Sequence, residues 1–179
     1  MHRINMSKAV RLGWFNIYDP DADYRIIFKQ RGLIMLGETD DDQHMDFLLV
    51  DTYNLNKKNR PKIVMELLLS KSKNKNSWHV DYTRVDNLYQ GQGLAPKMYR
   101  KLLKKMPGLM LEAGNLQSAG GRGIWAELGR MNDIWVFGKT KRSQPFELDV
   151  DECENELMSF DRRVYDNPRS NMYVFATAC

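Results

Sequence analysis

The sequence has few cysteines and histidines, and their spacing excludes several kinds of site. The two cysteines, Cys153 and Cys179, belong to a chain large enough to fold without a disulfide, so we expect free thiols. The three histidines, at positions 2, 44 and 79, are widely separated, and no His/Cys/Asp cluster has the spacing of metal ligands. A Gly-x-Ser-x-Gly motif is also missing. We therefore expect neither a metal site nor a serine-nucleophile triad.

Long apolar runs and a strong charge of one sign are absent too. No run approaches the roughly 18 apolar residues of a helical membrane span, and residues 1–6 lead into no apolar signal-peptide segment. The formal charge of +4 allows an acidic ligand but is far below the excess typical of a dedicated nucleic-acid binder. With 42% hydrophobic residues among 179, we expect one globular domain, residues 1–179. We also expect the protein to be cytoplasmic, to be monomeric or homodimeric, and to have no membrane partner.

Residues 78–106 predict a strand, a glycine turn and a basic amphipathic helix. In the helix, every fourth residue from Leu94 to Met106 is apolar, and basic residues occupy the opposite face. Pro96 fits the first helical turn, and Pro107 ends the helix. We expect the basic face to be solvated, except at Lys97, which lies nearest the turn.

A glycine turn at the start of a helix is typical of an anion-binding site. The first N–H groups lack intrahelical partners, and the helix dipole attracts negative charge. Glycines at 91 and 93 remove the Cβ atoms that would keep a phosphate from the backbone. The predicted ligand is a phosphate or diphosphate. A dinucleotide site ranks lower, because its fingerprint needs a small residue where this chain has Pro96, although Glu112 mimics its ribose-binding acid.

Residues 85–95 resemble the acyl-CoA loop of the GNAT superfamily of N-acyltransferases. The family pattern is Gln/Arg-x-x-Gly-x-Gly/Ala, and Gln90, Gly93 and Ala95 match its three defined positions. Residues 109–115 are similar to the family's next strand, which frequently ends in Asn, and residues 124–129 are similar to its next helix. The resemblance covers about residues 77–136.

The resemblance implies an α/β (α+β) fold, a mixed, mostly antiparallel twisted sheet of about six to seven strands with helices packed on it. Period-two and apolar patterns predict further strands at residues 24–29, 33–36, 47–50, 63–69, 132–137 and 172–176. A typical family member has two helices between its first two strands, and this chain shows no helical period there, so its acceptor site must be built differently. A C-terminal insertion at about 138–170 is either a specificity or partner element or a solvated excursion.

By resemblance, the chain is an N-acyltransferase that transfers an acetyl group from acetyl-CoA, or another short acyl-CoA, to a primary amine by direct attack. The thioester supplies the activated carbonyl, so no covalent enzyme intermediate is needed. In the family, amides of the strand before the loop bind the pantetheine and loop amides bind the diphosphate. The implied CoA-binding residues are Val85, Gln90, Gly91, Gln92, Gly93, Leu94, Ala95, Lys97 and Asn115.

Direct attack needs a base for the acceptor's ammonium group, and three side chains are candidates. His79 and Asp81 alternate in phase with Val85 along one strand. Glu66 lies amid apolar residues of the neighbouring strand, where burial would raise its pKa toward neutrality. Each has a structural alternative: a hydrogen-bonded sheet residue for His79, a solvated one for Asp81 and an exposed edge for Glu66.

An acid for the leaving thiolate is harder to assign. Trp125 occupies the position where the family often has a tyrosine, and an indole cannot donate a useful proton to a thiolate. Ser118, beside Asn115, is a candidate that equally fits a helix N-cap. Protonation through water is the alternative.

The acceptor is expected to be an amine-bearing protein or small molecule, and two other functions stay open. A non-catalytic CoA-binding protein would act through a protein partner at the insertion, and the missing tyrosine favours it. A nucleic-acid-modifying or nucleic-acid-binding protein would gather the basic segments into one patch. Those segments are residues 57–62, 71–75, 97–105 and 139–142.

Overall fold

The structure is a computed structural model that describes residues 25–39, 42–55, 61–73, 76–114, 119–140, 144–147 and 172–179. Contacts between Cα atoms divide the chain into two compact units. Unit 1 comprises residues 1–70 and 81–92, and unit 2 comprises residues 71–80 and 93–179. Strand β5 (Trp78–Val85) contributes residues to both. The expectation of a single domain stays a prediction.

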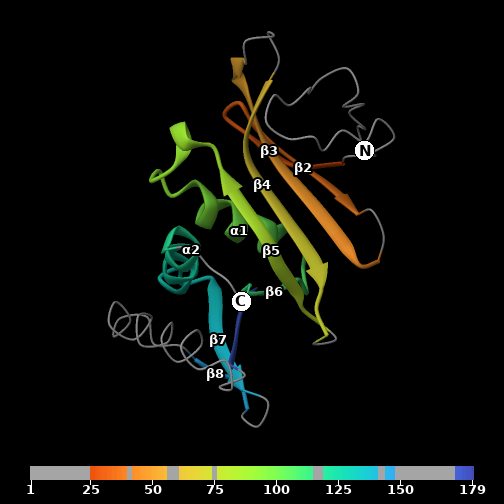
Figure 1. The fold of residues 1–179 in the computed structure, drawn as a ribbon, viewed down its shortest axis with the longest axis vertical. Coiled ribbons are helices and arrows are strands. Elements are labelled where there is room, and N and C mark those ends of the chain that lie inside the picture. Colours follow the sequence, from red (N-terminus) through yellow and green to blue (C-terminus); the bar gives the residue numbers. More distant parts are fainter. Residues whose placement is uncertain are drawn as a thin grey trace. The chain divides into compact units, whose positions relative to one another are not determined.

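Unit 1 is an antiparallel sheet in which each strand pairs with the next one along the chain. Its strands are β1 (Arg25–Gln30), β2 (Leu33–Thr39), β3 (His44–Leu55), β4 (Pro61–Lys71) and the second half of β5. β3 and β4 are long strands that run side by side (Figure 1), with Leu48 opposite Glu66. The strands predicted at residues 33–36, 47–50 and 63–69 are confirmed, since they lie within β2, β3 and β4.

The turn between β1 and β2 shows how a dipeptide sets the register of this sheet. Arg31 has φ 44° and Gly32 has φ 80°, both in the left-handed region. A two-residue turn with this conformation follows the right-handed twist of the flanking strands, as in a type I′ hairpin. Glycine adopts it freely, whereas arginine does so at some steric expense. The turn places Gln30 opposite Leu33.

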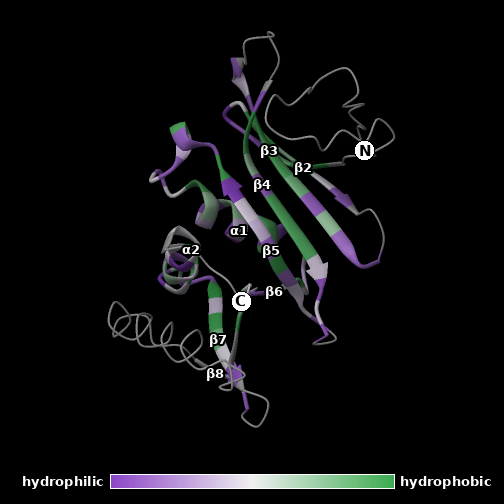
Figure 2. Ribbon diagram, viewed as in Figure 1, coloured by the Kyte–Doolittle hydropathy of each residue, from purple (hydrophilic) through white to green (hydrophobic). Residues whose placement is uncertain are grey.

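Strand β4 is hydrophobic along most of its length (Figure 2), and residues 63–67 are all buried. A strand that is buried on both faces has a continuous apolar run instead of an alternating pattern. This explains why residues 63–69 predicted a strand from composition alone. Glu66 lies inside the run, so its carboxylate is removed from water together with its apolar neighbours.

Unit 2 combines helices with a mixed sheet. Its elements are the first half of β5, α1 (Leu94–Lys105), β6 (Met110–Glu112), α2 (Ala119–Gly129), β7 (Ile134–Thr140), β8 (Phe146–Glu147) and β9 (Met172–Ala178). β5 and β6 pair in parallel, and α1 supplies the crossover that a parallel pair requires. β9 lies between β6 and β7 and is antiparallel to both, and β8 pairs with β7.

Helix α1 has the predicted apolar stripe and ends. Met98, Tyr99, Leu102 and Leu103 are buried. Pro96 is the third helical residue, where its missing N–H removes no intrahelical hydrogen bond. At the other end, the N–H of Met106 donates to the Leu102 carbonyl at 2.9 Å and caps the helix.

The predicted fold class is confirmed: the described residues form a mixed, mostly antiparallel sheet with two α-helices. The described residues contain nine strands, more than the six to seven expected. One of them, β8, has two residues and is too short to leave a periodic pattern in the sequence. Among the described residues, the first two strands, β1 and β2, are joined by a two-residue turn and not by helices. Most of the predicted insertion at 138–170 lies outside the described residues, namely residues 141–143 and 148–170.

Candidate functional site

The glycine turn is exposed and leads directly into α1. Gly91 and Gly93 both have left-handed backbones, with φ 73° and 63°. Residues 90–93 are exposed, and a Cβ at Gly91 would meet nothing within 4 Å. Gly93 is the N-cap of α1, and no side chain caps the helix. The start of α1 therefore presents backbone N–H groups without intrahelical partners at the surface.

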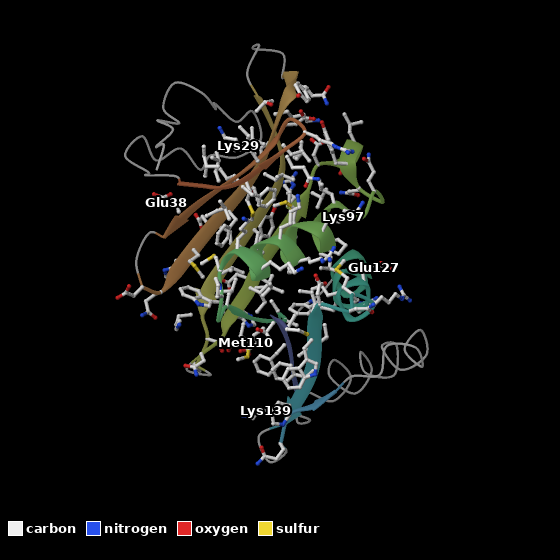
Figure 3. All side chains as sticks on the ribbon, turned by 180° about the vertical axis from the view of Figure 1, so that it is seen from behind. Lys29, Glu38, Lys97, Met110, Glu127 and Lys139 are labelled. Atoms are coloured by element: carbon white, nitrogen blue, oxygen red, sulfur yellow. The ribbon has the colours of Figure 1, made fainter. Side chains whose placement is uncertain are left out.

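Pro96 narrows the set of donors at this helix start. Because proline lacks an N–H, the donors of the first turn are Gly93, Leu94 and Ala95. The ammonium group of Lys97 lies beside the turn, 3.9 Å from where a Cβ at Gly93 would be, and Figure 3 shows this lysine near the beginning of α1. Dipole and ammonium charge both favour an anion here.

Two predicted CoA-binding glutamines hold the turn itself together. Gln90 Nε2 donates to the Val85 carbonyl at 2.9 Å and to Asn87 Oδ1 at 3.0 Å. Gln92 Nε2 donates to the Leu88 carbonyl at 2.9 Å. These bonds fold the chain back onto a short 3₁₀ helix, η1 (Asn87–Tyr89). Contact of either glutamine with CoA stays a prediction.

A network that the sequence did not reveal fixes the residues before the turn. Tyr89 Oη donates to Asp51 Oδ2 at 2.8 Å, and Lys62 Nζ pairs with Asp86 Oδ1 at 2.9 Å. Burial alone would raise the pKa of Asp51, but hydrogen bonds from Asn54 and Tyr89 lower it overall. The only sequence signal for this role was an acid directly after the apolar residues 47–50. Both bonds attach η1 and its cap to strands of unit 1.

Other cations of α1 already bind a carboxylate of unit 2. Arg100 donates to both oxygens of Asp133, with Nε to Oδ1 at 2.9 Å and Nη2 to Oδ2 at 2.7 Å, and Lys104 pairs with the same carboxylate. These hydrogen bonds and charges lower the pKa of Asp133 to about 2. Arg100 and Lys104 therefore connect α1 to the turn before β7, whereas the ammonium group of Lys97 lies beside the glycine turn.

Glu112 of unit 2 brings two serines and His79 together. It is only 4% exposed at the end of β6 and lies opposite His79 in the β5/β6 register. Its Oε2 accepts hydrogen bonds from Ser72 Oγ at 2.5 Å and Ser77 Oγ at 2.9 Å. Its Oε1 lies 3.9 Å from His79 Nδ1. A buried, hydrogen-bonded Glu112 leaves the dinucleotide alternative without its ribose-binding acid.

Gly114 allows the chain after β6 to pass close to β5. A Cβ at this position would lie 2.6 Å from the Val80 carbonyl oxygen, a distance that real Cβ atoms do not tolerate, and 4.0 Å from His79 Nε2. The residue must therefore be glycine for steric reasons. The Nε2 edge of the His79 ring lies beside this segment, and the Nδ1 edge faces Glu112.

Glu66 of unit 1 is buried as predicted, with 2% of its surface exposed. Neither carboxylate oxygen has a hydrogen-bond partner. Burial raises the pKa of Glu66 from 4.5 to about 7, and the charge of Arg84 opposes this rise while that of Asp46 adds to it. The exposed-edge alternative is therefore wrong, and the side chain has the acidity that a base near neutral pH needs.

The remaining predicted catalytic residues are placed less favourably or lie outside the described ranges. Asp81 is exposed and accepts a hydrogen bond from Ser70 Oγ at 2.9 Å, which matches its structural alternative. Asn115 and Ser118 lie outside the described residues. Trp125 is 6% exposed and packs edge-on against Tyr99, with ring centroids 6.2 Å apart, so it is a core residue.

Within the described ranges, no three His, Cys, Asp or Glu side chains are grouped so that they could hold a metal ion. Over the same part of the chain, no helix is both long enough and apolar enough to cross a membrane. Cys179 is a free thiol, as expected, and Cys153 lies outside the described residues.

No known protein family and no curated protein matches the sequence. Among solved structures, a protein from Bacteroides thetaiotaomicron that is assigned as an acetyltransferase of the GNAT family is similar to this chain. The alignment covers 70% of this chain and 75% of the other, with 10% sequence identity and a TM-score of 0.33. Because that TM-score is low, the match supports no conclusion about function.

Proposed function

We propose that this chain is an acyl-CoA-dependent N-acyltransferase that transfers an acetyl group from acetyl-CoA to a primary amine. The observation that supports it is the exposed start of α1, where a left-handed Gly93 without a side-chain cap lies beside the ammonium group of Lys97. The N–H groups of Gly93, Leu94 and Ala95 would bind the CoA diphosphate, and Lys97 would add a full positive charge. The resemblance of residues 85–95 to the acyl-CoA loop supports acyl-CoA as the ligand.

For this reaction, the chain must bind the diphosphate, orient the thioester and take a proton from the amine that receives the acetyl group. Acetyl-CoA supplies the activated carbonyl. Two described side chains suit the proton acceptor: Glu66, whose pKa of about 7 leaves it about half ionised at neutral pH, and His79, whose ring faces Glu112. The exposure of Asp81 makes it the third choice. Val85, residues 90–92 and Asn115 remain predicted CoA contacts.

The proposed acyl acceptor is an amine of a protein or a small molecule. Two alternative functions can be distinguished from this transferase activity. A non-catalytic CoA-binding protein would share the site at α1, and buried Trp125 in place of a tyrosine favours it. A nucleic-acid-binding protein would use the basic face of α1, but the pairing of Arg100 and Lys104 with Asp133 weakens that case.

Binding of acetyl-CoA tests the proposed site through a matched pair of glycines. Gly93 and Gly108 lie at opposite ends of α1 with φ 63° and 82°, so a leucine at either position meets a similar backbone strain. We expect Gly93→Leu to weaken acetyl-CoA binding at least about tenfold in isothermal titration, because the side chain covers the helix N–H groups. Gly108→Leu should bind as the wild type does. Equal affinities in the two variants would refute the site.

Turnover separates the enzyme from its alternatives. Thiol release from acetyl-CoA is measured over a panel of protein, polyamine and aminoglycoside-like amines. Turnover on any amine supports the transferase. Tight acetyl-CoA binding without turnover on the panel favours the non-catalytic protein, and no binding rejects both. Binding to DNA or RNA that weakens steeply with salt would support the nucleic-acid alternative instead.

A further inference from the structure

The 3₁₀ helix η1, directly before the glycine turn, has little apolar contact to hold it. None of its three residues is buried, and Leu88 at its centre is 75% exposed. Burial of apolar surface is the usual source of tertiary stability, so it contributes little here. The position of η1 on unit 1 must instead be set by hydrogen bonds and charges. These contacts gather on Tyr89 and on Asp86, the N-cap of η1.

Two strand residues that lie opposite each other hold Tyr89 at its two ends. Asp51 of β3 faces Lys62 of β4 in the strand register. The Tyr89 hydroxyl donates to Asp51 Oδ2 at 2.8 Å and accepts from Asn54 Nδ2 at 3.0 Å. Lys62 Nζ lies 5.3 Å from the centroid of the Tyr89 ring and also pairs with Asp86. We call these five residues, Asp51, Asn54, Lys62, Asp86 and Tyr89, the Tyr89 anchor.

Asp51 gives the anchor a fixed charge. It is 6% exposed, and its oxygens accept hydrogen bonds from the backbone N–H groups of Tyr53 and Asn54 as well as from Asn54 Nδ2 and Tyr89 Oη. Burial alone would raise the pKa of Asp51, but these hydrogen bonds lower it overall, so the carboxylate stays ionised at neutral pH. The bond from Tyr89 is therefore charge-assisted, and such bonds are stronger than those between neutral groups.

Two glutamines connect η1 to the glycine turn. The side chains of Gln90 and Gln92 donate to oxygens of residues 85–88, which are η1 and the residues before it. The conformation of residues 90–92 thus depends on η1, and the position of η1 depends on the Tyr89 anchor. The chain then continues directly into Gly93, the N-cap of α1.

We propose that Tyr89 is a positioning residue for acyl-CoA binding, because its bond to Asp51 holds the glycine turn in the conformation that receives the diphosphate. This inference rests on the proposed function. Gly91 and Gly93 can adopt many backbone conformations, so a turn that is not held would lose conformational entropy when an anion orders it. A turn that is already ordered avoids this loss and binds the ligand more tightly. In this role Tyr89 does not contact the ligand.

Binding and kinetics of Tyr89→Phe test the assignment. The change removes the hydroxyl and keeps the ring beside Lys62. We expect the Kd of acetyl-CoA in isothermal titration and its KM to rise at least about fivefold, with kcat within about twofold, because the turn binds the ground state and the transition state alike. The matched control is Tyr53→Phe, at a side chain that is 78% exposed on β3. It should bind as the wild type does.

A double-mutant cycle tests whether Tyr89 acts through Asp51. Both residues share one hydrogen bond, so their effects on acetyl-CoA binding should not add. In an Asp51→Asn background, Tyr89→Phe should weaken binding by less than it does in the wild-type background. Urea titrations check that each variant is folded. An equal loss in the two backgrounds would overturn the proposed route through Asp51.

Backbone dynamics separate positioning from a merely structural role. In the ligand-free protein, ¹⁵N order parameters of residues 90–93 should be about 0.85 in the wild type and in Tyr53→Phe, and below about 0.6 in Tyr89→Phe. A role confined to stability would lower the free energy of unfolding and leave both the order parameters and the KM unchanged. The measurement needs no substrate.

The outcomes separate a failure of this inference from a failure of the proposed function. If the wild type binds acetyl-CoA and Tyr89→Phe binds it equally well, Tyr89 is not a positioning residue and the transferase stands. Unchanged order parameters of the turn in Tyr89→Phe, or a loss of kcat with an unchanged KM, would overturn the inference in the same way. If the wild type does not bind acetyl-CoA, the proposed function fails, and the role of Tyr89 in it fails too.

Discussion

Glu66 in unit 1 and Glu112 in unit 2 are both buried at the level of core residues, yet their surroundings are opposite. Glu66 lies in an apolar strand and has no hydrogen-bond partner on either oxygen. Glu112 ends a strand and accepts hydrogen bonds from Ser72 and Ser77. Burial is therefore similar in the two cases, and the supply of donors differs.

The contrast separates two effects of burying a carboxylate. Without donors, the lost hydration penalises only the charged form, and the group responds by holding its proton to a pKa of about 7. With donors, the lost hydration is replaced by fixed dipoles, so a buried charge is tolerated. The first arrangement makes unit 1 sensitive to pH, and the second makes unit 2 sensitive to loss of a hydroxyl.

The largest expected effect is on stability against pH. The folded-state pKa of Glu66 lies above its unfolded value, so the folded protein binds more protons and its stability falls as pH rises from 4.5 to about 7. The corresponding loss is up to about 3 kcal/mol of unfolding free energy. Urea titrations at pH 5, 6, 7 and 8 should show it in the wild type.

Glu66→Leu should remove most of that fall and be the more stable protein at pH 8. The lowered pKa values of Asp51 and Asp86 act in the opposite direction and below pH 3.8, outside this window. A wild-type slope that persists in Glu66→Leu would show that Glu66 is solvated in the folded protein.

The next largest loss of stability is expected when a hydrogen-bond donor to Glu112 is removed. Ser77→Ala leaves the buried carboxylate with one hydroxyl fewer, and Ser77 is 1% exposed, so water does not readily replace it. We expect a loss of about 2 kcal/mol in unfolding free energy at pH 7. Ser70→Ala, which removes a donor from exposed Asp81, should change it by less than about 0.5 kcal/mol. A loss of less than about 0.5 kcal/mol in Ser77→Ala as well would mean that this donor to Glu112 is dispensable.

The smallest effect on stability is expected from Asp133, a surface carboxylate with cationic partners. Its folded-state pKa is lowered from 3.8 to about 2, so its contribution to stability is present above pH 3.8 and is lost as pH falls toward 2. Asp133→Asn should flatten this acid limb of the thermal unfolding midpoint. High salt should reduce the difference between the two proteins. A salt-independent difference would indicate a packing effect instead.

Much of the fold could be predicted because local signals agreed with tertiary structure. The apolar run at 63–69, the Arg31-Gly32 turn and the four-residue spacing of α1 each specify an element without long-range information. The strand order could not be obtained in this way. That β9 lies between β6 and β7 depends on contacts between segments far apart in sequence, which periodicity does not encode.

The site was predictable only where one segment carries it. Residues 90–97 form a turn and a helix start, and the sequence located both. The left-handed backbones of Gly91 and Gly93 are seen only in the structure. The burial of Glu66 also followed from its neighbours. In contrast, Glu112 meets Ser72, Ser77 and His79 only through the parallel pairing of β5 with β6, and Asp51 meets Tyr89 across 38 positions of sequence. Such partners are set by tertiary structure.

The place of β9 in the sheet of unit 2 has a consequence for biosynthesis. β6 and β7 both take their backbone partners from β9, which begins at Met172, whereas β6 ends at Glu112. A nascent chain therefore carries two unsatisfied strand edges until the ribosome has released residues 172–178. Open edges of this kind readily pair with other chains. Slow translation between residues 112 and 172 would prolong that exposure.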